Sequence, residues 1–180
     1  MNITQKDYIE KLVEDLKELD DALYWLRRSY QICQDIGIKP KYKEDEFDAF
    51  ETLTGRFARL SDMLIQKIFR SIDKIEFEKE GTLLDVLNRS HKRGLITSID
   101  EIREIRELRN DISHEYTPRE LKELFDDTLK HTAVLFEIID RVDKYIEKYQ
   151  EMLEKKKKKE KKGTVKRETM GSGKLFAPGK

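Results

Sequence analysis

Residues 98–120 read SIDEIREIRELRNDISHEYTPRE, and this stretch contains two helix starts with a break between them. Ser98-Ile99-Asp100-Glu101 has the Ser-x-x-Glu form of a capping box, in which a hydroxyl and a carboxylate satisfy free amides at a helix start. Thr117-Pro118-Arg119-Glu120 repeats the signal, with a proline at the first helical position, where its missing amide costs little. The residue before a proline avoids helical geometry. We therefore expect one helix to end between Arg109 and His114, and another to begin at the proline.

Apolar residues return every three or four positions over most of the remaining chain, a pattern that predicts amphipathic helices. The expected helices run from Thr4 to about Asp35, from about Asp45 to Ile75, from Thr82 to near Gly94, from Ser98, and from Thr117–Pro118 until the pattern fades at Lys155–Lys159. No strand pattern and no internal repeat interrupts them. The sequence therefore predicts an all-α fold, an antiparallel helical bundle of four long helices plus a short connecting helix.

Gly55 is an exception inside the second expected helix. A glycine in a helix interior costs about 1 kcal/mol relative to alanine. It either marks a close contact between helices or is a tolerated weakness, and the sequence leaves both readings open.

Charge divides the 180 residues into a helical domain at 1–150 and a basic tail at 151–180, for which we expect disorder. The tail holds 11 Lys and Arg against 4 Glu, which leaves the domain 26 of the 37 basic and 33 of the 37 acidic residues. Such an acidic domain is unlike a general nucleic-acid binder. Any contact with RNA must come from a local basic patch, a groove formed by a dimer, or the tail.

The sequence also bears on the location of the protein. Cys33 has no second cysteine for an internal disulfide, and no secretion signal is recognisable at the N-terminus. No uncharged run approaches the roughly 20 residues that span a bilayer. We expect a cytoplasmic protein with no membrane partner.

The segment between the last two expected helices carries more chemically active side chains than a core requires, namely Arg109, Asn110, Asp111, Ser113, His114 and Tyr116. Cleavage of RNA without a metal needs a base for the 2′-hydroxyl proton, an acid for the leaving oxygen, and positive charge on the phosphorane. Histidine titrates near neutral pH and arginine binds phosphate oxygens. One Arg109 and one His114 supply few groups for these three tasks. A homodimer that brings two copies of each together across a twofold axis is therefore part of the hypothesis.

This pattern of Arg109, Asn110, His114 and Tyr116, with a helix on either side in an all-α chain, resembles the HEPN superfamily, and within it the HepT-like toxins. The resemblance implies a homodimeric endoribonuclease in which Arg109 and His114 are catalytic and Asn110 and Asp111 support them. It also implies a minimal nucleotidyltransferase antitoxin as partner, which transfers AMP to Tyr116. The RNA substrate, tRNA or mRNA, stays open. Some relatives are instead non-catalytic, substrate-binding or partner subunits of a nucleotidyltransferase, and that alternative stays open too.

Plainer interpretations of the same residues exist. Arg109 could pair with an acid such as Asp111 or Glu104, while His114 caps a helix end and Tyr116 packs. The three histidines, His91, His114 and His131, are scattered and lack the Glu-x-x-His repeats of di-iron bundles, so we expect neither a metal nor a cofactor. Trp25, Tyr24 and Tyr30 fit packing in the core or a dimer better than a platform for stacking bases.

Overall fold

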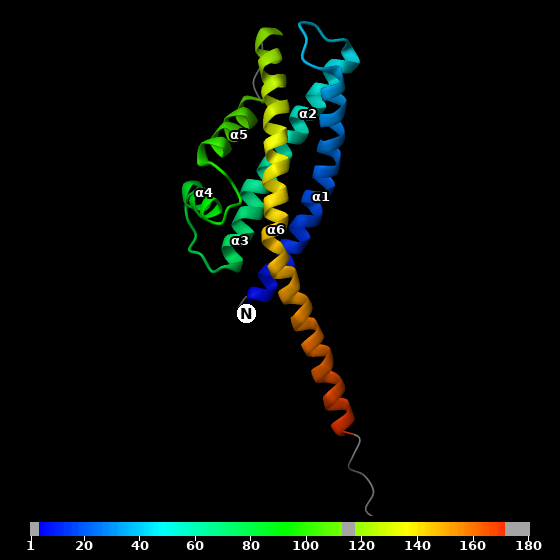
Figure 1. Cartoon of the computed structure of the whole chain (residues 1–180), viewed down its shortest axis with the longest axis vertical. Helices are drawn as coiled ribbons and strands as arrows, with labels where there is room; N and C mark the ends of the chain where they lie inside the picture. Colours follow the sequence, from blue (N-terminus) through cyan, green and yellow to red (C-terminus); the bar gives the residue numbers. More distant parts are fainter. Residues whose placement is uncertain (1–3, 113–117, 172–180) are drawn as a thin grey trace, which may run out of the picture. The chain divides into compact units, whose positions relative to one another are not determined.

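The computed structural model describes residues 4–112 and 118–171, and every regular element within these ranges is helical (Figure 1). The elements are α1 (Gln5–Ile36), α2 (Glu44–Asp62), η1 (Met63–Ile68), α3 (Phe69–Ile75), α4 (Leu83–Lys92), α5 (Ile99–Asp111) and α6 (Pro118–Gly171). Because α2, η1 and α3 follow one another without a break, they form one continuous helix. The predicted all-α class is confirmed.

The chain divides into two units, residues 1–145 and residues 146–180. In the first unit, α1 packs along the helix formed by α2, η1 and α3 (Figure 1). Helix α5 contacts α2, and helix α4 contacts α3. In the second unit, α6 continues as a helix to Gly171. The division falls five residues before the predicted domain boundary at residue 150, and disorder of the basic tail stays a prediction.

Helix ends in the first unit follow the capping signals of the sequence. The Thr4 side chain caps α1 together with Asp7, and α1 ends at Gly37, whose φ of 72° suits a glycine and whose N–H donates to the Cys33 carbonyl over 2.9 Å. Helix α6 begins at Pro118, as predicted. The predicted helix bounds are accurate because these capping residues mark the helix ends in the sequence.

The start of α5 differs in detail from the predicted capping box. The Ser98 hydroxyl accepts a hydrogen bond from the Asp100 N–H over 3.1 Å. Glu101, however, accepts from the Thr97 hydroxyl over 2.9 Å. The carboxylate therefore finds a side-chain donor one residue before the cap, and α5 still begins at the predicted place.

Aromatic and aliphatic side chains fill the core of the first unit. Phe50 of α2 and Phe125 of α6 stack with ring centroids 4.6 Å apart, and both are fully buried. Tyr30 of α1 meets Phe136 of α6 edge-on at 5.3 Å. Stacked and edge-on aromatic pairs stabilise a core beyond the area that they bury. Tyr30 thus serves packing, as expected, whereas Trp25 and Tyr24 are 45% and 64% exposed and do not belong to the core.

The second predicted helix contains a feature that the sequence did not predict. Residues 63–68 form a π-helix, η1, which buries Leu64, Ile65 and Ile68 and leaves Gln66 and Lys67 exposed. A π-helix adds a residue to each turn and so shifts the face on which later side chains lie. Such segments are frequent at functional sites, so the residues on either side of η1 are candidates for a functional role.

Replacing Gly55 with alanine should stabilise the protein by about 0.5–1 kcal/mol, because the interior of α2 gains a better helix former. Gly55 is exposed, and a Cβ added there meets no atom within 4 Å, so the close-contact reading is wrong. Urea unfolding monitored by circular dichroism measures the change. Gly37→Ala is the control and should destabilise the fold, since Gly37 has positive φ. A loss of stability in Gly55→Ala would contradict the account.

Candidate functional site

Arg109 lies in the last turn of α5, at the helix end that the sequence predicts. The helix ends at Asp111, and the Ile112 N–H closes it by donating to the Leu108 carbonyl over 3.0 Å. Leu108 is buried, whereas the Arg109 side chain keeps 41% of its surface exposed. A cation here interacts favourably with the partial negative charge of the helix C-terminus. Arg109 is thus anchored on a packed helix with its guanidinium open to solvent.

The Arg109 guanidinium is held by Asp62, the last residue of α2. Its Nε and Nη2 both donate to Asp62 Oδ2, over 3.0 and 2.7 Å, and its Nη1 donates to Asn110 Oδ1 over 3.3 Å. These bonds engage three of the five N–H donors that a guanidinium carries. Because the Asp62 side chain is 47% exposed, the pair contributes about 1 kcal/mol at most to stability. Its main consequence is therefore the orientation of Arg109.

Asp62 is the residue of this site that the sequence analysis missed. Glu104 and Asp111 are the acids close to Arg109 in sequence, but Asp62 lies 47 residues earlier in the chain. No capping signal or motif marks it. It becomes adjacent only because α2 packs against α5, and a pairing of that kind depends on how the two helices are rotated about their axes.

The position of Asp62 connects the Arg109 site to the π-helix. Asp62 immediately precedes η1, and its own backbone is still α-helical, with φ −63° and ψ −44°. The described residues therefore bring together a helix-end arginine, an orienting carboxylate, an adjacent amide and a π-helical segment. This combination can present a fixed positive charge to an anionic group.

The other predicted site residues divide into two groups. Asn110 is exposed and contacts Arg109, and Asp111 is exposed at the end of α5. His114 and Tyr116 lie outside the described residues, so their predicted roles rest on the sequence. The five-residue segment that contains them joins the end of the α5 region to the start of α6 at Pro118.

Other chemically active residues of the described chain lie away from Arg109 in sequence. His91 is exposed on α4 and His131 lies on α6. Within the described ranges, no group of three His, Cys, Asp or Glu residues is arranged to hold a metal ion. Burial raises the pKa of the Cys33 thiol to about 12, so at neutral pH it stays protonated and is a poor nucleophile.

Fold and site together define an all-α helical protein with an exposed, carboxylate-oriented arginine at a helix end. No protein-family model, no curated protein and no solved structure matches the chain. The resemblance to the HEPN superfamily therefore stays a prediction from the residues. None of the helices in residues 4–112 and 118–171 is long and apolar enough to cross a membrane.

Proposed function

We propose that the protein is a cytoplasmic endoribonuclease of the HEPN type, with Arg109 and His114 as its catalytic residues. The observation that carries the proposal is the placement of Arg109. Its guanidinium is exposed, oriented by Asp62, and located directly before the segment that carries His114. A fixed guanidinium stabilises the extra negative charge of a phosphorane more than that of the ground-state phosphodiester.

The chemistry needs only the RNA and protein side chains. One imidazole takes the proton of the 2′-hydroxyl, whose oxygen attacks the adjacent phosphorus. The bond from phosphorus to the 5′-oxygen breaks, and a second imidazole, in its protonated form, supplies a proton to that oxygen. Because the chain has a single His114, a homodimer that places two copies in one cleft supplies the base and the acid. Asn110 and Asp111 support the arrangement next to Arg109.

Control of this activity falls to Tyr116 in the same proposal. A minimal nucleotidyltransferase antitoxin transfers AMP from ATP to the Tyr116 hydroxyl and releases pyrophosphate. The adduct carries negative charge two residues from His114, so it competes with the RNA phosphate for Arg109. The partners are therefore an RNA such as tRNA or mRNA, a second copy of the chain, and the antitoxin.

The function is tested by incubating total RNA and purified tRNA with the isolated protein in EDTA. We expect cleavage by the parent and a loss of about 10²–10⁴-fold in His114→Ala, since a general acid or base contributes that much. His91→Ala is the matched control, because His91 is exposed on α4, and it should cleave like the parent. A folded, AMP-free parent that cuts no RNA would contradict the proposal and favour the non-catalytic subunit.

A further inference from the structure

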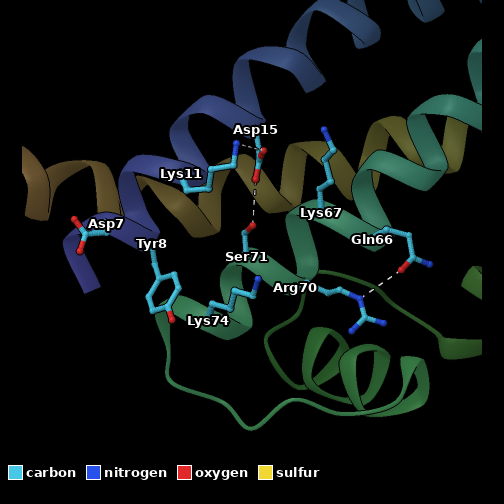
Figure 2. Close-up of a pocket in the computed structure, with 9 residues that line it drawn as sticks. All are labelled: Asp7, Tyr8, Lys11, Asp15, Gln66, Lys67, Arg70, Ser71 and Lys74. Carbon is cyan, nitrogen blue, oxygen red and sulfur yellow. Dashed lines mark hydrogen bonds and ion pairs between the residues drawn. The ribbon is translucent and has the colours of Figure 1, made fainter. Parts of the chain in front are cut away.

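The face between α1 and the helix formed by η1 and α3 contains a hollow of about 450 Å³ (Figure 2). Four basic side chains line it, Lys11 from α1 and Lys67, Arg70 and Lys74 from successive turns of the opposite helix. Its volume is in the range of pockets that bind small ligands. The π-helix contributes Lys67 directly, so the shift in helical face that η1 produces helps to gather these cations.

The acidic groups of this hollow are already engaged. The carboxylate of Asp15, which is buried, accepts from Ser71 over 3.2 Å and pairs with Lys11 over 3.3 Å. Asp7 is bonded to Thr4 at the helix start. Both acids of the hollow are thus bonded to protein side chains, and the four basic side chains outnumber them.

Two of the basic groups have no carboxylate partner among the described residues. Lys67 is paired with Glu18 over 2.7 Å. Arg70 donates to the Gln66 amide oxygen over 3.4 Å, and within the described ranges neither Arg70 nor Lys74 is in an ion pair. Arg89 and Arg93, by contrast, are both paired with Asp73. Arg70 and Lys74 are therefore available to an external anion.

A second hollow, of about 270 Å³, is lined by Ala22 and Trp25 of α1 and by Arg56 and Arg59 of α2. Arg56 is fixed, since it donates to the Trp25 carbonyl over 3.0 Å and to the Ser29 hydroxyl, and its guanidinium lies 5.2 Å from the Trp25 ring centroid. Neither Arg56 nor Arg59 pairs with a carboxylate among the described residues. An indole that is 45% exposed thus lies beside two guanidinium groups that no carboxylate of the described residues neutralises.

The two hollows share one face of α1. Ala22 follows Lys11 by eleven residues, which is about three turns at 3.6 residues per turn, so both point in nearly the same direction. Trp25 lies about 21 Å from Lys11 along the helix axis at 1.5 Å per residue. Four cations of the opposite helix line this face, in a domain with more acidic than basic residues, and none of them pairs with a carboxylate of the described residues: Arg56, Arg59, Arg70 and Lys74.

We propose that this face, the two hollows together, binds the phosphate groups of a single-stranded RNA. Unpaired cations in a row bind successive phosphates, and an exposed indole beside them offers a surface on which a base stacks, which is the combination that holds single strands. The choice of RNA rests on the proposed function, but the binding does not require cleavage. Asp62, which orients Arg109, lies three residues from Arg59 on the same helix, less than one helical turn away.

Binding is measured with an oligonucleotide of about 12 nucleotides, within the usual range of single-strand sites, whose 2′-oxygens are all methylated so that it cannot be cut. The full chain has one tryptophan, Trp25, so its fluorescence reports the second hollow. We expect quenching of Trp25 on binding. In Arg70→Gln/Lys74→Gln the slope of log K against log salt should fall by about 1.4, at about 0.7 per phosphate contact, and affinity roughly 25-fold at about 0.1 M salt.

The matched control is Lys79→Gln/Lys92→Gln, which removes two exposed positive charges outside both hollows. The basic tail contributes equally to all variants, so only differences between them report the face. Unchanged affinity in Arg70→Gln/Lys74→Gln, an equal loss in the control, or the absence of quenching would overturn the proposal. Tighter binding of ATP than of the oligonucleotide, at the same residues, would also overturn it and assign the site to a free nucleotide.

These outcomes are separate from those of the nuclease test. If the parent binds the methylated strand but cuts no RNA, the result supports the RNA-binding face and contradicts the proposed function. If the parent cuts RNA, and Arg70→Gln/Lys74→Gln cuts RNA at the same rate and binds the methylated strand equally well, the result supports the nuclease and contradicts the RNA-binding face.

Discussion

Arg109→Ala should lower the rate of RNA cleavage by about 10²–10³-fold, the loss that follows removal of one group that stabilises a developing negative charge. The effect should fall on kcat, because the guanidinium stabilises the transition state more than the bound substrate. Stability should change by no more than about 1 kcal/mol, since the Arg109–Asp62 pair is half exposed. Single-turnover cleavage of tRNA and thermal unfolding measure the two quantities.

Arg103→Ala is the matched control for this variant. Arg103 is also an exposed arginine of α5, and it pairs with Asp100 over 2.9 Å. It should keep the parent rate. Asp62→Asn distinguishes orientation from charge, because the guanidinium stays but loses its anionic partner. We expect a fall in kcat of about tenfold, as for a displaced catalytic group, with KM little changed. If Arg109→Ala cleaves RNA at the parent rate, Arg109 is not a catalytic residue.

Asp73→Asn should destabilise the fold by about 3 kcal/mol, because removing one partner from a buried ion pair leaves charge uncompensated. Asp73 of α3 is buried and accepts from Arg89 over 3.0 and 2.6 Å and from Arg93 over 2.5 Å. Burial lowers the pKa of Arg93, but its hydrogen bonds to Asp73 and Glu76 outweigh burial and raise that pKa overall. An arginine side chain is effectively always protonated in proteins, so both arginines stay charged when Asp73 is replaced.

The size of this loss is set by what remains around Arg93. Glu76 still accepts from Arg93 over 2.8 Å, so the expected value lies at the lower end of the range for buried pairs. Urea unfolding measures the change in the free energy of unfolding, provided that the m-value is the same in the parent and the variant. Asp100→Asn, in the exposed pair with Arg103, is the control and should cost less than about 1 kcal/mol. A loss below 1 kcal/mol in Asp73→Asn would contradict the account.

The fold was largely predictable from the sequence, because helix starts and ends depend on neighbouring residues. Thr4, Gly37 and Pro118 act within one helical turn of the ends that they define. The π-helix at 63–68 was not predictable in this way. Its apolar residues also fit an ordinary helix, and the extra residue per turn depends on packing against other helices.

The site was predictable only in part. Arg109 was expected at the end of α5, and the structure places it there. Its contact with Asp62 joins residues 47 positions apart, so it depends on the rotation of α2 against α5, which no local pattern encodes. The basic row of the face between α1 and the opposite helix was anticipated only as a local basic patch of unknown position. The shift at η1 decides which side chains that patch contains.

The chemistry of the cut tests the central claim most directly. An RNA oligonucleotide that the protein cleaves is incubated with it in EDTA, and the ends of the fragments are identified by mass spectrometry. Attack by the 2′-oxygen predicts a 2′,3′-cyclic phosphate on one fragment and a 5′-hydroxyl on the other, and no cleavage where the attacking hydroxyl is replaced by hydrogen. Fragments with 3′-hydroxyl and 5′-phosphate ends, or cleavage that persists without the 2′-hydroxyl, would contradict the mechanism proposed for Arg109 and His114.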